Sequence, residues 1–398
     1  MNLVSDRLNN LAPSATLAMS QKSNELKAQG VDVINLSVGE TDFFTPDGIK
    51  AAGKKAIDEN YSFYSPVPGY LSVRQAIAGK LKRENGLDYK PEQIVCSNGA
   101  KQSVCNAILC LINPGDEVII PAPYWVSYEQ MVILAEGKCV IVKTGLEQNF
   151  KMTAAQLEAA ITPKTKALIL CSPSNPTGGV YSKEELKALV DVLAKHPQVI
   201  VISDEIYEHI NYVGSHESIA QFPEIKERVA LINGVSKAYA MTGYRLGFMA
   251  GPDWLVKACN KLQGQYTSGP CNIAQKAAEE AFNGDQTPVV EMGKAFARRR
   301  ALVMELLKEI PGLECNEPEG AFYIFPRCSS YFGKTAPDGS KINGSLDLAL
   351  YLLNTAHVAC VAGVAFGDDD YIRMSYATSD ENLREAFSRI GKALAQLQ

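Results

Sequence analysis

Residues 166–207 read KALILCSPSNPTGGVYSKEELKALVDVLAKHPQVIVISDEIY. Within them, residues 166–171 and 199–202 are short, largely apolar runs of the kind that forms buried strands. Between these runs, Ser182 is followed three residues later by Glu185, which is the capping-box pattern that begins a helix. An apolar strand, a helix and a second apolar strand predict one unit of a mostly parallel sheet with helices on both faces.

The same alternation continues on both sides of this stretch. Further strand-like runs cover residues 93–97, 117–120, 139–142 and 229–232, and helical patterns cover residues 100–112 and 126–135, with another helix beginning at Thr153. We therefore expect a large domain with a mostly parallel sheet sandwiched by helices, over residues 45–285.

The rest of the sequence has a different character. A long basic helix is predicted over residues 294–308, and strand-like runs at 321–325 and 358–362 flank a polar, Gly-rich segment at 333–345. This pattern predicts a smaller α+β domain, formed by residues 286–398 together with residues 1–44. The predicted fold class is α/β, with the small domain built from both ends of the chain.

The composition is that of an ordinary globular protein. The 398 residues are 46% hydrophobic, and 39 basic against 44 acidic side chains give a formal net charge of −5. A mildly acidic total argues against nucleic acid as a partner, because phosphate binding requires a basic face. No apolar run is long enough for a membrane helix, the start lacks a signal-peptide pattern, and the ten cysteines form no Cys-x-x-Cys pair. We therefore expect a cytoplasmic protein without membrane contact.

Common nucleotide and metal motifs find no support. No Gly-x-Gly-x-x-Gly follows a predicted strand, and the run at 48–55 departs from a phosphate-binding loop because Lys55 stands where Ser or Thr would bind magnesium. The four histidines show no metal-ligand spacing, and we expect His209 and His216 to be surface or loop residues. Neither a dinucleotide site nor a metal site is predicted.

Four polar motifs stand at the ends of predicted strands. They are SNGAKQ at 97–102, NPTG at 175–178, SDEIY at 203–207, and GVSK at 234–237 with GYRLG at 243–247. Open α/β sheets bind ligands at the carboxyl ends of their parallel strands, where we expect all four motifs to lie. Taken singly, each has an ordinary explanation as a turn, a helix cap or a surface lysine. Only their order and spacing together indicate a common site.

In this order the motifs resemble the class I/II aminotransferases, the fold-type I enzymes that use pyridoxal 5′-phosphate (PLP). SPSNPTGG at 172–179, SDEIYEH at 203–209 and VSKAYAMTGYRLG at 235–247 each match, and the similarity extends from about residue 12 to the C-terminal helix. PSAT at 13–16, PYWVSY at 123–128 and GAKQ at 99–102 are most similar to the bacterial aspartate aminotransferase branch called subgroup Iβ. The resemblance implies PLP as cofactor and a homodimer with shared sites.

The resemblance also implies which residues bind the cofactor. Lys237 would form the covalent link to PLP and later move a proton on the substrate, so its ammonium must lose a proton near neutral pH. Asp204 would face the ring nitrogen and favour its protonated form. The other contacts would be Asn175 and Tyr207 at the phenolic oxygen, Trp125 against the ring, Gly99, Ala100, Lys101, Ser236 and Arg245 at the phosphate, and Tyr64 at the neighbouring subunit's phosphate.

Substrate binding is assigned by the same resemblance. Arg373, in the run YIRMS at 371–375, would grip the α-carboxylate with a forked pair of hydrogen bonds, and a structural salt bridge is the alternative. The other substrate contacts would be the Gly39 backbone, Trp125 and Asn175, with Lys101, Ser14 and Thr16 at the side-chain carboxylate. For Lys101, phosphate contact or plain solvation is the alternative.

The implied reaction is transfer of the amino group from L-aspartate to 2-oxoglutarate by a ping-pong route, giving oxaloacetate and L-glutamate. One alternative keeps PLP but changes the substrate, as in an aminotransferase for aromatic amino acids, kynurenine or prephenate, or in a carbon–sulfur or cyclopropane-forming lyase. Another is a non-catalytic regulator on the same fold, against which the acidic composition argues. The expected partners are small molecules, namely amino acids and 2-oxo acids.

Overall fold

The computed structural model describes residues 3–398, so residues 1 and 2 of the predicted small domain lie outside the described part. Its centre is a seven-stranded sheet in the order β2-β8-β7-β6-β5-β3-β4. The strands are β2 (Ile94–Ser97), β3 (Glu117–Ala122), β4 (Lys138–Lys143), β5 (Thr165–Cys171), β6 (Ile200–Asp204), β7 (Val229–Gly234) and β8 (Gly247–Ala250). All neighbours are parallel except β8, which runs antiparallel to β2 and β7. The predicted α/β fold class is confirmed.

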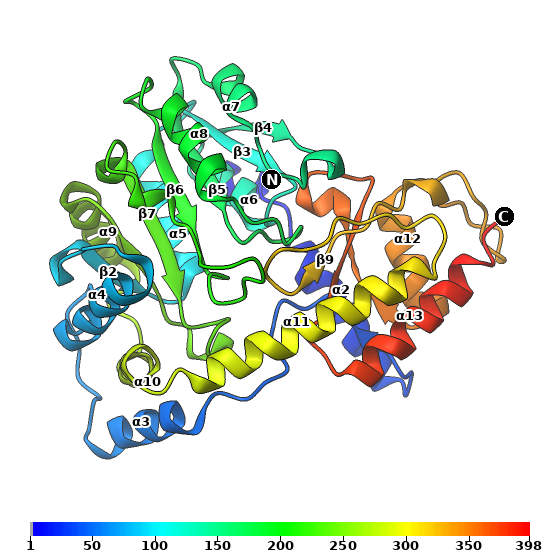
Figure 1. The fold of residues 1–398 in the computed structure, drawn as a ribbon, viewed down its shortest axis with the longest axis horizontal. Coiled ribbons are helices and arrows are strands. Elements are labelled where there is room, and N and C mark those ends of the chain that lie inside the picture. Colours follow the sequence, from blue (N-terminus) through cyan, green and yellow to red (C-terminus); the bar gives the residue numbers. More distant parts are fainter. Residues whose placement is uncertain (1–2) are drawn as a thin grey trace.

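Helices cover both faces of this sheet (Figure 1). They are α4 (Leu71–Asn85), α5 (Ala100–Leu111), α6 (Ser127–Leu134), α7 (Ala154–Ala160), α8 (Lys183–Leu193), α9 (Asp253–Tyr266) and α10 (Asn272–Asn283), and α3 (Asp47–Asp58) packs against α10. Successive strand residues face opposite sides, so Leu168 packs in one apolar core with α8 and α10, while Ile169 packs in another with α5 and α9. The Ser182 capping box forms as predicted, with Ser182 Oγ accepting from Glu185 N.

Strand β8 corrects one expectation about the motifs. The run GYRLG at 243–247 precedes a strand instead of following one. Because β8 is antiparallel to β7, its first residue, Gly247, pairs with the last residue of β7, Gly234. A Cβ on Gly247 would lie 2.2 Å from Ala100 N, so this close approach requires glycine. Arg245 therefore still reaches the ligand-binding edge of the sheet.

The remaining elements come from both ends of the chain. They are α1 (Asp6–Asn9), α2 (Ala15–Ala28), β1 (Ile34–Asn35), α11 (Thr287–Lys308), β9 (Tyr323–Ile324), α12 (Ser345–Tyr351), β10 (Val358–Ala359), β11 (Val361–Ala362), β12 (Ile372–Ser375) and α13 (Asp380–Leu394). Met19 and Leu36 share an apolar core with residues from α11 and α13. In Figure 1 the yellow helix α11 runs from the region of the sheet to this second group of elements. The domain boundaries at 45 and 285 stay a prediction.

The strand predicted at 358–362 is two strands. β10 pairs in parallel with β1, whereas β11 pairs antiparallel with β12, which in turn pairs with β9. The break falls at Cys360, where the chain leaves one partner for another. Among the described residues, no helix is long and apolar enough to cross a membrane.

Candidate active site

A cavity of about 600 Å³ lies at the edge of the sheet where β5, β6 and β7 end. Thirteen of the fifteen predicted site residues line it: Ser14, Thr16, Gly39, Ala100, Lys101, Trp125, Asn175, Asp204, Tyr207, Ser236, Lys237, Arg245 and Arg373. Gly99 is the residue just before α5, next to this lining. The volume falls within the range of small-molecule sites.

Lys237 follows β7 and projects into the cavity. Its Nζ donates to the backbone oxygen of Gly39 at 2.5 Å. Burial lowers the pKa of Lys237 to about 8; the carboxylate of Glu40 acts against this shift, while the guanidinium groups of Arg373 and Arg245 add to it. The amine can therefore be uncharged close to neutral pH, which a nucleophile or base requires.

Asp204, the last residue of β6, is a buried carboxylate at the floor of the cavity. Tyr128 Oη donates to Oδ2 at 2.6 Å, and Ile206 N donates to Oδ1 at 3.3 Å. Burial raises the pKa of Asp204 to about 6, and these two hydrogen bonds oppose the rise. Asp204 is thus suited to pair with a cationic ring nitrogen of a ligand.

An anion cradle is formed where α5 begins. Gly99 has a φ of +84°, and a Cβ on it would lie 2.5 Å from Arg245 Nη2. The guanidinium of Arg245 donates to the backbone oxygens of Asn98 at 3.2 Å and Thr242 at 2.9 Å, which fix it against this helix start. Helix N–H groups and a fixed guanidinium together favour a phosphate.

Arg373 on β12 is only 2% exposed. Its Nη1 donates to Asn175 Oδ1 at 3.0 Å and its Nη2 to the backbone oxygen of Ser37 at 2.6 Å. Its guanidinium lies 4.5 Å over the ring of Tyr323. Among residues 3–398 no carboxylate forms an ion pair with it, and the titratable groups that favour its charge are only the phenols Tyr323 and Tyr207, which leaves a buried cation able to bind the carboxylate of a ligand. The salt-bridge alternative therefore has no partner in the described chain.

The predicted residues for a second carboxylate lie at the same cavity. Lys101 Nζ is 5.0 Å from the centre of the Trp125 ring, and burial, with a smaller effect of Arg245, lowers the pKa of Lys101. Ser14 caps α2 by accepting from Leu17 N, and Thr16 lies in the first turn of that helix. The cationic amine and the two hydroxyl side chains border one space.

Tyr128, Tyr323 and Glu40 are among the lining residues that were not predicted. Tyr128 bonds Asp204, Tyr323 Oη lies 2.8 Å from Tyr207 Oη, and Glu40 accepts from Thr242 Oγ1 at 3.0 Å. Tyr128 stands inside the run PYWVSY at 123–128, one of the runs that carry the family resemblance. The sequence offers no comparable signal for Tyr323 or Glu40.

Tyr64 does not join this cavity within the chain. Its side chain is 99% exposed, and it borders a separate hollow of about 520 Å³ with Phe63 and residues 267–273. A contact of Tyr64 with a bound phosphate would have to involve another copy of the chain.

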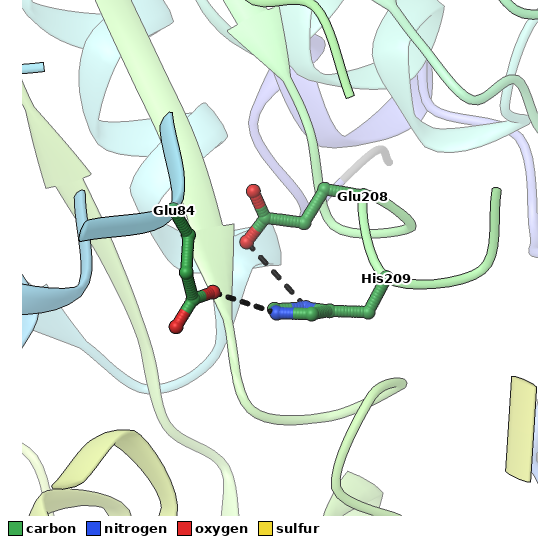
Figure 2. Close-up of side chains that lie close together, drawn as sticks. All are labelled: Glu84, Glu208 and His209. Atoms are coloured by element: carbon green, nitrogen blue, oxygen red, sulfur yellow. Dashed lines mark hydrogen bonds and ion pairs between the residues drawn. The ribbon is translucent and has the colours of Figure 1, made fainter. Parts of the chain in front are cut away.

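His209 and His216, expected to be surface or loop residues, do lie in loops, and both contact carboxylates. The His216 side chain is only 6% exposed and its Nε2 lies 2.9 Å from Glu205 Oε2. Figure 2 shows that His209 lies between two carboxylates, with Nε2 at 2.9 Å from Glu84 Oε2 and Nδ1 at 3.5 Å from Glu208 Oε1. These contacts arise from the turn after β6. It directs Asp204 and Tyr207 to the cavity, whereas Glu205 and Glu208 face the histidines on the other side.

A lysine already pairs with these buried carboxylates. Lys80 on α4 is 1% exposed and its Nζ contacts Glu208 Oε1. Asn85 and Asn233 each donate to Glu208 at 2.8 Å. The acidic and imidazole groups around Glu208 are thus held together by an ammonium and by amides.

A lysine of lowered pKa, a buried carboxylate and a guanidinium without an ion pair among the described residues thus border one cavity. A family model for aminotransferase class I and II matches residues 31–390. The chain therefore belongs to this family and is an aminotransferase.

Three proteins illustrate what this chain is similar to in sequence and structure. A protein named probable aspartate/prephenate aminotransferase from Rhizobium leguminosarum bv. phaseoli is 52% identical over 393 residues, which cover 98% of each chain. The aspartate aminotransferase structure from Rhizobium meliloti has a TM-score of 0.96 at 43% identity and covers 100% of both chains. The Thermus thermophilus aspartate aminotransferase with maleate has a TM-score of 0.92 at 41% identity, over 99% of this chain and 100% of that one.

Proposed function

We propose that the cavity binds PLP and that the protein transfers the amino group of L-aspartate to 2-oxoglutarate. The donor set fits the cofactor: a low-pKa amine for the aldehyde, a buried carboxylate for the ring nitrogen and a helix start with a guanidinium for the phosphate. When bound, PLP supplies an electron sink for the bonds at the substrate Cα.

Each side chain has a distinct task toward this cofactor. Lys237 Nζ would hold the aldehyde carbon, and Asp204 would pair with the protonated ring nitrogen. Asn175 Oδ1 already accepts from Arg373, which leaves its amide nitrogen to donate to the phenolic oxygen together with Tyr207. The remaining contacts would be Trp125 on the ring face and Gly99, Ala100, Lys101, Ser236 and Arg245 at the phosphate.

The substrate would be held at both ends. Arg373 and the Gly39 backbone would bind the α-carboxylate, with Trp125 and Asn175 alongside, and Lys101, Ser14 and Thr16 would bind the side-chain carboxylate. Lys237 Nζ would then carry the proton that leaves Cα, because its lowered pKa lets it be an uncharged base. The maleate that accompanies the Thermus thermophilus enzyme is itself a dicarboxylate, which supports a dicarboxylate substrate for this chain.

Prephenate is a second amino acceptor that we propose for the same site. The observation in its favour is the name aspartate/prephenate aminotransferase of the 52% identical relative. Prephenate also carries two carboxylates, so the two cationic ends of the cavity would serve it as well. Kynurenine and aromatic amino acids would rank lower as donors, because they lack the second acidic group.

The assembly and location are part of the proposal. Two copies would form a homodimer in which Tyr64 of each reaches the phosphate bound by the other, and the chain would divide at residues 45 and 285 into a large and a small domain. We propose a cytoplasmic enzyme whose partners are amino acids and 2-oxo acids, not nucleic acid or membrane.

The observation that carries the proposal is the convergence of Lys237, Asp204 and Arg373 on one cavity. The test is a panel of amino donors with 2-oxoglutarate and with prephenate, using PLP-loaded protein. We expect aspartate with either acceptor, and glutamate with prephenate, to exceed aromatic donors by kcat/KM, and Lys101→Ala to reduce aspartate turnover more than aromatic turnover. Preference for an aromatic donor, or equal damage to both by Lys101→Ala, would reject dicarboxylate specificity.

A further inference from the structure

Tyr128, at the start of α6, is a buried phenol with one strong contact. Its Oη donates to Asp204 Oδ2 at 2.6 Å, and the residue is 2% exposed. The two residues are 76 positions apart in the sequence. A hydrogen bond this short to a buried carboxylate constrains both the rotamer and the protonation of the acid.

The ring of Tyr128 also touches the residue expected to cover the cofactor. Its centroid lies 5.3 Å from that of Trp125, with the rings at 85°. This edge-to-face contact joins the residue proposed for the ring face to the residue that orients Asp204. Tyr128 therefore contacts both residues proposed to bind the aromatic ring of the cofactor, Trp125 at its face and Asp204 at its nitrogen.

Four titratable side chains lie around the Asp204 carboxyl group. Tyr128 and Cys171 stay neutral at working pH, because burial raises the pKa of Tyr128 far above 10 and that of Cys171 to about 12. Glu205 opposes ionisation of Asp204, and Lys237 favours it. Tyr128 is thus a hydrogen-bond donor at every relevant pH.

We propose that Tyr128 is a positioning residue that holds Asp204 ionised and aimed at the ring nitrogen of the cofactor. The inference rests on the proposed binding of PLP. It goes beyond that proposal because it assigns to Tyr128 a role in tuning the cofactor, through a residue that the substrate does not need to touch.

The test is the PLP dissociation constant of Tyr128→Phe and of the wild-type protein, measured by equilibrium dialysis between pH 5 and pH 9. Without the Tyr128 hydroxyl, the Asp204 carboxylate loses one hydrogen-bond donor, which should raise the pKa of Asp204 by about one unit. Titration of PLP itself cancels in the ratio of the two constants. We expect binding weakened about tenfold at pH 5 and within about twofold at pH 9. An equal loss at all pH values, or no loss, would overturn the inference.

Tyr124→Phe is the matched control, because it removes a phenol from the same loop that bonds Glu129 at 3.1 Å instead of Asp204. It should leave the pH dependence unchanged. A second measurement compares the PLP dissociation constants of Asp204→Asn and of the double variant that also carries Tyr128→Phe. The two constants should differ by less than about twofold. Additive losses would show that Tyr128 does not act through Asp204, whereas a wild-type protein that fails to retain PLP would reject the proposed function itself.

Discussion

Lys237 has an amine whose charge state is set by its surroundings. Burial and the guanidinium groups of Arg373 and Arg245 lower its pKa, and only Glu40 and Asp204 act in the other direction. Because the uncharged amine is the nucleophile, the shift decides the pH at which the protein can capture an aldehyde.

We predict that PLP capture by the cofactor-free protein rises about tenfold per pH unit below pH 8 and levels off above it, because the pKa of Lys237 is about 8. Stopped-flow absorbance between pH 6 and pH 10 measures this. Nα-acetyllysine is the control, and its rate should keep rising to about pH 10.4. A shared profile for both amines would contradict the lowered pKa.

Gly99 gives a second prediction at this scale. Gly99→Ala would place a Cβ 2.5 Å from Arg245 Nη2 in a backbone conformation that favours glycine, so PLP binding should weaken by tenfold or more, about 1.4 kcal/mol. Gly86→Ala is the control: its φ is +65°, with nothing within 4 Å of the added carbon, so it should cost stability but not PLP affinity. Equal PLP affinity in both variants would argue against the cradle.

Individual site residues differ in how well the sequence predicts them. Asp204 and Lys237 belong to runs whose order along the chain is informative, and both reach the cavity. Tyr323 and Glu40 depend on partners 116 and 202 residues away, and no local pattern encodes such a contact. The contact of His216 with Glu205, 11 residues away, is likewise not encoded by a local pattern.

At the scale of elements, the turn after β6 is held by hydrogen bonds and an ion pair on its side away from the cavity. Glu208 joins this turn to α4 through Lys80 and Asn85, and to β7 through Asn233, whose Oδ1 accepts from Gly234 N at 2.7 Å. The segments that carry Asp204 and Lys237 thus share one buried carboxylate.

We predict that Glu208→Gln lowers the free energy of unfolding by up to about 3 kcal/mol at pH 7, because the buried ammonium of Lys80 then keeps only Glu84, at 3.6 Å, as an ion-pair partner. The pKa of Glu208 is lowered in the folded state, so its stabilisation is present above its unfolded pKa, near 4.5, and is lost as pH falls below it. Urea unfolding at pH 7 and pH 3.5 should show the gap narrowing. Glu305→Gln, at an exposed pair with Lys308, should cost under about 1 kcal/mol. A constant gap would contradict the ionic origin.

Long elements were predicted better than short ones. The helix over 100–112 and the strand at 117–120 recur as α5 and β3 with small changes at their ends. The strand β8 and the division of the predicted strand 358–362 into β10 and β11 depend on partners elsewhere in the chain, which periodicity does not reveal.

At the scale of the whole molecule, one surface region is unusually apolar. Phe63 is 80% exposed and Tyr64 99%, and both border the hollow of about 520 Å³. Large exposed aromatic side chains that gather around one hollow are typical of an interface between proteins, and here a second copy of the chain is the proposed occupant.

We predict a particle of about twice the 43.2 kDa chain mass by light scattering. Tyr64→Phe should keep this mass but weaken PLP binding several-fold, because the hydroxyl would serve the neighbouring phosphate. Tyr266→Phe is the control, because Tyr266 is a half-exposed tyrosine that bonds Asn106, and it should keep PLP affinity. A monomer with full PLP affinity would reject the shared site.

The lone guanidinium on β12 has a consequence for handling the protein. Formate, acetate and citrate offer the same planar pair of oxygens that Arg373 would receive from an amino acid. Such buffer anions would act as competitive inhibitors, inflating KM in proportion to their concentration while kcat stays constant. Kinetic constants for this enzyme should therefore be compared only between assays of equal carboxylate content.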